Sequence, residues 1–183
     1  MTRPATVRLC RVCWSATFAK QEEPAQDPKA LSKISYGMFL LTTNGEKDNG
    51  CIVNTVAQVA SDPTRLAISV QKHTLTGETV VSTGTLNLSV LTEDAPFDLI
   101  RRFGMQSGRD TDKFAGFDSV KRSQNGLLYL TRYANAMFSC KVIQTIDLED
   151  HVMFLAEVTE SKVLGAAPSC TYDYYHKAIK QKF

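Results

Sequence analysis

Two polar side chains interrupt an apolar run in the first third of the chain. Asn54 and Thr55 stand between Val53 and Val56, in a segment that continues to residues 61–63. Polar side chains that become buried in a folded protein need hydrogen-bond partners. The pair therefore either caps a neighbouring strand or faces a bound ligand.

A second polar segment, residues 71–76, carries Gln71, Lys72, Thr74 and Thr76. The surrounding pattern predicts the end of a strand followed by the start of a helix. Exposed backbone N–H groups, hydroxyls and one lysine at such a corner suit a phosphate group. A solvated helix cap made by the same residues is the alternative interpretation.

Two further places combine charge with an aromatic ring or an imidazole. Residues 107–114 form a charged segment that ends in Lys113 and Phe114, and it is either a functional loop or a solvated turn. His151 directly follows Asp150 at the expected start of a strand. A lone histidine of this kind is either a functional group or an ordinary surface or core side chain.

The elements that must position these residues are mostly strands. Alternating or compact apolar runs predict strands over 37–43, 51–60, 65–71, 86–91, 127–130, 134–146 and 152–164. Short helices are expected over 75–82 and 95–103, and an acidic hairpin turn over 147–150. The βαβ rhythm, a G-x-G-x-x-G loop and a Walker loop are missing, so a Rossmann-type nicotinamide site is not encoded. We expect a mainly β protein with short inserted helices, built as a closed or partly closed antiparallel barrel.

Composition limits the classes of partner. The 183 residues carry a formal net charge of +2, and their apolar runs are short, so neither nucleic acid nor a membrane is expected as a partner. Five cysteines without a secretory leader favour a reducing, cytoplasmic location. We interpret residues 1–28 as a tail or arm, with Cys10 and Cys13 incidental, and residues 29–183 as one domain.

In order and spacing, the four segments resemble one family, the flavin reductase-like FMN-binding split barrels. Its members carry A-N-S before S-x-D-P, then N-K-x-x-x-T, then D-K-F, and then G-D-H before G-E-V. The corresponding residues here are 53–55 with 60–63, 71–76, 112–114, and 149–151 with 156–158. Over about residues 29–180, including the tyrosine-rich segment 171–177, the chain looks closest to the flavin reductase part of high-molecular-weight rubredoxins and to flavoredoxin-like proteins.

Four positions depart from the family pattern. Gln71 replaces asparagine, Glu149 replaces the glycine of G-D-H, and Ala156 replaces the glycine of G-E-V. Gly77 stands where the family often has histidine, which removes a side chain that could approach the flavin or a nicotinamide. FMN binding is compatible with all four changes, whereas the nicotinamide side of the site is the one that they affect.

The resemblance implies a dimeric antiparallel split β-barrel that binds FMN without a covalent link. It places the flavin ring along Val53, Asn54, Thr55 and Val56, the phosphate near Lys72 and Thr76, and further contacts at Gln71, Thr74, Lys113 and Phe114. His151 would lie where a nicotinamide approaches the flavin, as a positioning or charge-stabilising group.

The resemblance also implies a flavoprotein oxidoreductase that takes electrons from NAD(P)H. Its acceptor would be free flavin, ferric iron or a small redox protein such as a separate rubredoxin. Two alternatives stay open: a flavoredoxin-type electron carrier without direct NAD(P)H chemistry, and a barrel that binds flavin without catalysis.

Overall fold

The computed structural model describes residues 27–182, and the chain divides into two compact units, residues 1–33 and 34–183. In the first unit the described residues form one short helix, α1 (Pro28–Leu31), which Asp27 caps by accepting a hydrogen bond from the Lys29 N–H at 2.9 Å. Cys10 and Cys13, with most of the predicted tail, lie outside the described residues.

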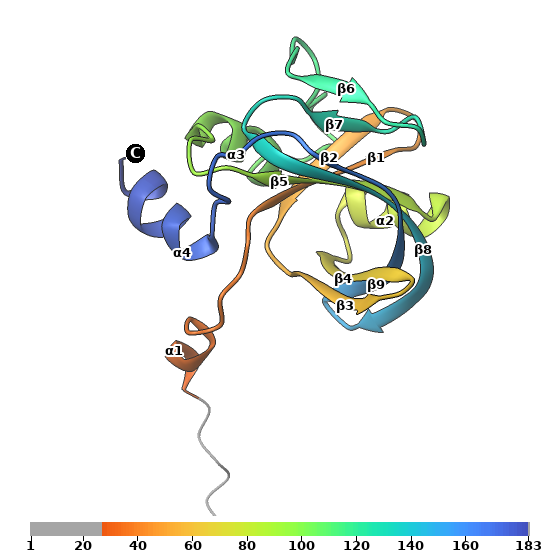
Figure 1. The fold of residues 1–183 in the computed structure, drawn as a ribbon, viewed down its shortest axis with the longest axis horizontal. Coiled ribbons are helices and arrows are strands. Elements are labelled where there is room, and N and C mark those ends of the chain that lie inside the picture. Colours follow the sequence, from red (N-terminus) through yellow and green to blue (C-terminus); the bar gives the residue numbers. More distant parts are fainter. Residues whose placement is uncertain (1–26, 183) are drawn as a thin grey trace, which may run out of the picture. The chain divides into compact units, whose positions relative to one another are not determined.

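The second unit is built on a seven-stranded antiparallel sheet in the order β2-β1-β5-β8-β9-β4-β3 (Figure 1). The strands are β1 (Phe39–Asn44), β2 (Asp48–Val53), β3 (Val56–Ser61), β4 (Thr64–Gln71), β5 (Thr85–Leu91), β8 (Ala134–Leu148) and β9 (His151–Val163). A separate two-stranded sheet consists of β6 (Val120–Arg122) and β7 (Leu128–Leu130). The prediction of a mainly β, antiparallel architecture is confirmed.

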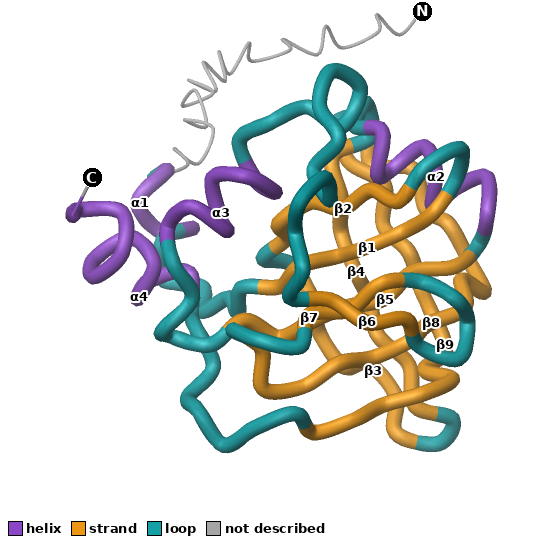
Figure 2. The backbone as a smooth tube through the Cα atoms, turned by 90° about the horizontal axis from the view of Figure 1, so that it is seen from above, coloured by secondary structure: helices purple, strands orange, loops and turns teal. Residues whose placement is uncertain are grey.

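The two edge strands of the large sheet, β2 and β3, are consecutive in the chain and joined only by Asn54 and Thr55. Six inter-strand steps of about 4.8 Å would hold the edges of a flat sheet roughly 29 Å apart. The three Cα steps from Val53 to Val56 reach at most about 11 Å. The sheet must therefore curl into a barrel, and in Figure 2 its strands cross over one another as the two walls of a barrel do.

The single strand predicted over residues 51–60 was wrong, because the chain changes its pairing partner in the middle of this segment. β2 pairs with β1, whereas β3 pairs with β4 at the opposite edge of the sheet. Asn54 and Thr55 are the crossing point, and two polar residues suit a link that leaves one ladder before it joins the next. The barrel stays split here, since β2 and β3 are not hydrogen-bonded to each other.

Both predicted helices of the barrel are present. In α2 (Leu75–Thr83) the Thr74 side chain caps the first turn, and Gly84 ends the helix with a left-handed φ of 67°. The second helix, α3 (Phe97–Gly104), begins after Pro96. The tyrosine-rich segment is helical: α4 (Tyr172–Tyr174) continues as a π-helix (Tyr175–Ile179) and a 3₁₀ turn (Lys180–Lys182).

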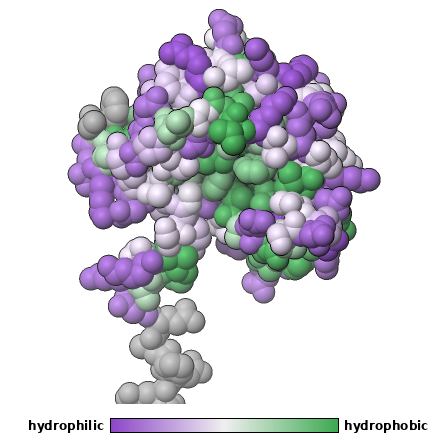
Figure 3. Space-filling view, in the orientation of Figure 1, coloured by the Kyte–Doolittle hydropathy of each residue, from purple (hydrophilic) through white to green (hydrophobic). Residues whose placement is uncertain are grey.

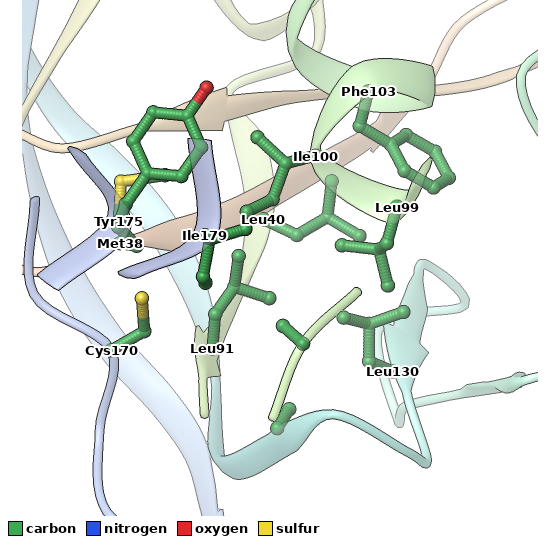
Figure 4. Packing of buried hydrophobic residues seen from close by; sticks show 12 residues of the cluster. Met38, Leu40, Leu91, Leu99, Ile100, Phe103, Leu130, Cys170, Tyr175 and Ile179 are labelled. Carbon is green, nitrogen blue, oxygen red and sulfur yellow. The ribbon is translucent and has the colours of Figure 1, made fainter. Parts of the chain in front are cut away.

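Two apolar clusters hold this unit together. The first fills the space between the sheet, α3 and the C-terminal helices; Figure 4 shows Met38, Leu40, Ile100 and Tyr175 close together there, with Phe103 farther along α3. The second occupies the barrel interior and includes Leu41, Ile68, Val80, Leu86, Leu88 and Phe154. Apolar residues also gather in the centre of the face shown in Figure 3. Among residues 27–182 no helix is long and apolar enough to span a membrane.

The predicted acidic turn between β8 and β9 is confirmed. Leu148 pairs with His151, which leaves Glu149 and Asp150 in a two-residue turn. Glu149 adopts a φ of 67°, a left-handed conformation that favours glycine. The departure from the family's glycine at this position is therefore a source of backbone strain.

Glycine should suit position 149 better than another L-residue. The left-handed backbone costs an L-residue roughly 1–2 kcal/mol, and the extra unfolded-state entropy of glycine offsets roughly 0.5–1 kcal/mol of the relief. We expect Glu149→Gly to exceed Glu149→Ala in the free energy of unfolding by about 1 kcal/mol. Urea denaturation followed by circular dichroism measures the difference, and an alanine variant that is equally stable contradicts the prediction.

Candidate functional site

A cleft of about 410 Å³ opens beside the split in the barrel. Its walls come from the end of β2, the link after it, the end of β4, the start of α2, the loop that follows α3, and the first residue of β9. The lining residues include Asn49, Cys51, Ile52, Val53, Asn54, Ser69, Gln71, His73, Thr74, Leu75, Thr76, Gly104, Gly108, Arg109, Lys113 and His151. The volume lies within the roughly 300–1,000 Å³ that is usual for cofactor sites.

The cleft brings together seven of the site residues predicted from the sequence: Val53, Asn54, Gln71, Thr74, Thr76, Lys113 and His151. Pairing of β4 with β9 places Gln71 directly opposite His151. Antiparallel pairing thus joins two segments that lie far apart in the chain.

Four other predicted residues are not among those that line the cleft. Thr55 is exposed and its carbonyl accepts a hydrogen bond from the Ser69 N–H at 3.0 Å. Val56 packs against the barrel core, and the Phe114 ring packs on Phe103 with 5.0 Å between ring centroids.

The fourth of them, Lys72, forms an ion pair with Asp147. Its backbone N–H also donates to the Asp150 carbonyl at 3.0 Å. Both the side chain and the backbone of Lys72 are therefore bonded to the β8–β9 hairpin. The ion pair holds the pKa of Asp147 below its ordinary value, mainly through the hydrogen bond that Lys72 donates. In this arrangement the lysine contributes its charge to the turn rather than to the cleft.

The start of α2 gives one end of the cleft its hydrogen-bond donors. The Thr74 hydroxyl accepts from the Gly77 N–H at 3.1 Å and donates to the Gln71 carbonyl at 2.9 Å. The first N–H groups of a helix have no partner within that helix, and Leu75 and Thr76 line the cleft at this point. An anion is favoured here by these donors and by the helix dipole.

Arg109 supplies a cation at the cleft that the sequence motifs do not single out. Arg109 is among the residues that line the cleft, and its guanidinium is paired with Glu78 at 2.6 Å, with about half of each side chain exposed. In the sequence Arg109 is one charge among several in residues 107–114, and no local pattern distinguishes it. Only the fold shows that this arginine stands beside the start of α2.

Lys113 is buried and fixes the long loop after α3. Its side chain is 4% exposed, and Nζ donates to the carbonyls of Gly50 at 2.9 Å and Phe103 at 3.0 Å. Burial lowers the pKa of Lys113, and the neighbouring Cys51 opposes that shift. Through Lys113, the D-K-F segment therefore links β2 to α3, and the same lysine lines the cleft.

A second contact, made by Asn49 of β2, holds the same loop. Asn49 is 3% exposed and its Nδ2 donates to the Thr76 hydroxyl at 2.9 Å. Gly108 packs directly on this side chain: a Cβ built at Gly108 would lie 2.3 Å from Asn49 Oδ1. No local sequence pattern predicts this contact, because the contact joins a strand and a loop about sixty residues apart.

His151 lines the cleft and is partly exposed. Its Nδ1 lies 3.0 Å from Asp150 Oδ1, its side chain is 40% exposed, and hydrogen bonding by the imidazole lowers the pKa of Asp150. Gly77, by contrast, does not face the cleft, because a Cβ there would lie 2.8 Å from the Gln71 carbonyl oxygen. The lack of a side chain at Gly77 is therefore explained by crowding in the corner between β4 and α2, and not by room for a bound flavin.

The chain is similar to several known proteins. A family model described as a flavin reductase like domain matches residues 31–181. The chain is 40% identical over 152 residues to a high molecular weight rubredoxin of Moorella thermoacetica, covering 82% of this chain and 66% of that protein. It is 35% identical over 158 residues to a ferric-chelate reductase (NAD(P)H) of Archaeoglobus fulgidus, covering 85% of this chain and 92% of that protein.

Among solved structures, an NADH:FAD oxidoreductase of Streptomyces globisporus superposes with a TM-score of 0.70 at 22% identity, covering 81% of this chain and 93% of that one. A flavoredoxin of Methanosarcina acetivorans superposes with a TM-score of 0.64 at 20% identity, covering 70% of this chain and 69% of that one. At these identities the two neighbours show the shared fold.

The packing of Gly108 on Asn49 predicts an energetic coupling between these residues. Gly108→Ala forces the Asn49 side chain away from Thr76 and should destabilise the fold by about 1–3 kcal/mol. In an Asn49→Ala background the obstructing atoms are gone, so the same change should cost at least about 1 kcal/mol less. A double-mutant cycle measured by urea denaturation tests this, and equal costs in the two backgrounds count against the contact.

Proposed function

This chain belongs to the flavin reductase-like family, and from that premise we propose that it is an FMN-dependent oxidoreductase that takes electrons from NAD(P)H. The family predicted from the four sequence segments is the family found. The observation that carries the proposal is the cleft itself, which is lined by residues from three of those segments together with His151. We propose that FMN occupies this cleft without a covalent link.

The cleft has chemically different ends, which fits the two parts of FMN. At the α2 end, backbone N–H groups, the Thr76 hydroxyl and the Arg109 guanidinium favour a phosphate. The Thr74 hydroxyl caps the helix and already donates its proton to the Gln71 carbonyl. Toward the split in the barrel, Ile52 and Val53 offer an apolar wall. A planar ring would be favoured there by burial of apolar surface.

The side chains near the apolar end would orient the ring and its partner. When bound, FMN supplies the hydride and electron chemistry, and the protein adjusts it through hydrogen bonds. Asn54 and Gln71 both line the cleft, and their amide groups can hydrogen-bond ring carbonyls and nitrogens. His151, opposite Gln71, would hold a nicotinamide in line or stabilise developing charge.

Two assignments compete for the phosphate. The sequence pattern favours Lys72, whereas the cleft geometry favours Arg109. Both cations are paired with a carboxylate, Lys72 with Asp147 and Arg109 with Glu78, but of the two only Arg109 lines the cleft. We propose Arg109 as the main cation, and Lys72 stays a prediction of the sequence pattern.

Names of the relatives support the electron acceptors that we propose. A ferric-chelate reductase and a high molecular weight rubredoxin are among the curated relatives. We infer that this chain passes electrons to free flavin, ferric iron or a small redox protein such as a separate rubredoxin. The chain spans 66% of the rubredoxin relative's length, so the activity of that whole protein is not carried over.

FMN binding and its phosphate contact can be tested with purified protein. We expect stoichiometric FMN, released into the supernatant by acid precipitation. Arg109→Ala should weaken FMN binding about tenfold to a hundredfold, because charge-assisted hydrogen bonds contribute roughly 1.5–3 kcal/mol. Riboflavin, which lacks the phosphate, should bind nearly as before.

Lys72→Ala is the matched control for that measurement. A larger loss of FMN affinity in Lys72→Ala than in Arg109→Ala favours the sequence-based assignment. Equal losses for FMN and riboflavin would mean that the fold, rather than the phosphate contact, was damaged. A protein purified without flavin that also fails to bind added FMN rejects the proposal.

The reductase activity is tested by anaerobic rapid mixing of FMN-loaded protein with NADH and with NADPH. We expect flavin reduction, slowed about 10- to 1000-fold in His151→Ala with FMN affinity nearly intact. Unchanged kinetics in His151→Ala removes that residue from the proposal. No reduction by either nucleotide supports the flavoredoxin-type carrier instead.

We also propose that the protein is a homodimer. Exposed apolar side chains on several strands, including Val59, Ile143 and Leu148, give a second copy surface to cover. Light scattering at micromolar concentration should report twice the chain mass of 20.3 kDa, with and without FMN. A single-chain mass in both states refutes the dimer.

A further inference from the structure

A smaller hollow of about 240 Å³ adjoins the flavin cleft on the side of the C-terminal helices. It is lined by Met38, Ile52, Asn54, Ile100, Gly104, Met105, Tyr172 and Tyr175. Three of these residues, Ile52, Asn54 and Gly104, also line the cleft, so the two spaces share a wall. We propose that this hollow is a binding subsite for a one-ring quinone that accepts electrons, an inference that rests on the proposed function.

The hollow has a rigid apolar floor and an exposed apolar rim. Met38, Ile100 and Tyr175 belong to the first apolar cluster and are at most 5% exposed; they appear together in Figure 4. At the rim, Met105 is 55% exposed and Tyr172 is 39% exposed. Large apolar side chains exposed beside a concave floor are typical of binding sites.

Polar groups of the hollow are available to a ligand. Among the described residues, the Tyr172 and Tyr175 hydroxyls and the Asn54 amide nitrogen have no hydrogen-bond partner; the Asn54 oxygen accepts from Thr55 at 3.2 Å. Burial and the nearby Tyr172 raise the pKa of Tyr175, so its hydroxyl keeps its proton at neutral pH. All three groups can therefore donate a hydrogen bond to an oxygen atom.

Size and donor chemistry together define the ligand class. The hollow is smaller than the roughly 300–1,000 Å³ of sites for drug-sized molecules, so it suits one ring and not a second flavin. Tyrosine rings favour an aromatic or planar partner, and the tyrosine and asparagine donors favour carbonyl oxygens. A quinone has both features.

The redox step balances with what the proposed function supplies. The quinone takes up two electrons and two protons, and each carbonyl oxygen gains an O–H bond to give the hydroquinone. Both electrons and one proton come from the two-electron-reduced flavin as a hydride equivalent, and the second proton comes from solvent. The shared wall at Asn54 keeps donor and acceptor adjacent.

Binding is measured first, independently of activity. Duroquinone, whose ring positions are all substituted and cannot alkylate cysteine, is titrated into the protein and followed by saturation-transfer NMR, with and without FMN. We expect saturable binding, weakened about threefold to tenfold by Tyr172→Phe and by Tyr175→Phe, each of which removes one hydrogen bond. Tyr174→Phe, from the same segment but outside the hollow, should leave the affinity unchanged.

Electron transfer is measured next. Met105→Trp should fill the hollow from its exposed rim. In anaerobic stopped-flow experiments on photoreduced protein, this variant should slow flavin reoxidation by duroquinone at least about tenfold, as expected when a whole binding subsite is lost. Reoxidation by a ferric chelate, which does not need the hollow, should be unchanged.

Each failure has a distinct meaning. Absence of saturable duroquinone binding, equal affinity in all three tyrosine variants, or an unchanged quinone rate in Met105→Trp overturns the subsite. Failure of the proposed function is seen separately as absence of FMN binding, while the NMR titration of flavin-free protein still reports on the hollow.

Discussion

The two-residue link between β2 and β3 is the constraint on which the rest of this structure depends. Asn54 and Thr55 must join strands that stand at opposite edges of a seven-stranded sheet. Because so short a link cannot span a flat sheet, the sheet closes on itself. The closure is incomplete at the link, because the edge strands β2 and β3 are not hydrogen-bonded to each other. The cleft opens beside that split.

Closure also explains why residues distant in the chain meet in one site. Curling brings the end of β2 near the end of β4, and the β4–β9 ladder sets His151 against Gln71. The start of α2 follows β4 directly, so its N–H groups arrive at the same place. The pairing and order of the strands thus bring polar and apolar side chains from distant segments into one cleft.

The loop after α3 completes the cleft, and buried polar contacts fix it in place. Lys113 binds two backbone carbonyls, and Asn49 supports Gly108 while it holds Thr76. A buried ammonium is costly unless its donors are satisfied, which ties the loop firmly to β2 and α3. A site whose wall is a loop needs such anchors to stay preorganised for its ligand. These contacts also hold Arg109, which lies in the same loop, beside α2.

The sequence by itself determined the class of fold, both barrel helices, the acidic turn and seven of the residues that line the cleft. These features depend on local patterns: alternation in strands, a threonine cap before α2, glycine at 84 after it, and short motifs whose order matches a family. Local patterns cannot reveal which strand a segment pairs with. For that reason the break at Asn54 and Thr55 was read as one continuous strand.

Only the tertiary structure decided the roles of individual charges. The sequence pattern favours Lys72 for a phosphate, yet the fold pairs Lys72 with Asp147 and places Arg109, not Lys72, among the residues that line the cleft. The sequence leaves residues 107–114 as either a functional loop or a solvated turn, whereas in the fold Lys113 is buried and Phe114 packs on Phe103. The physical reason is that hydrogen bonds and ion pairs depend on distances of a few ångströms between segments tens of residues apart, and those distances are set only when the barrel closes.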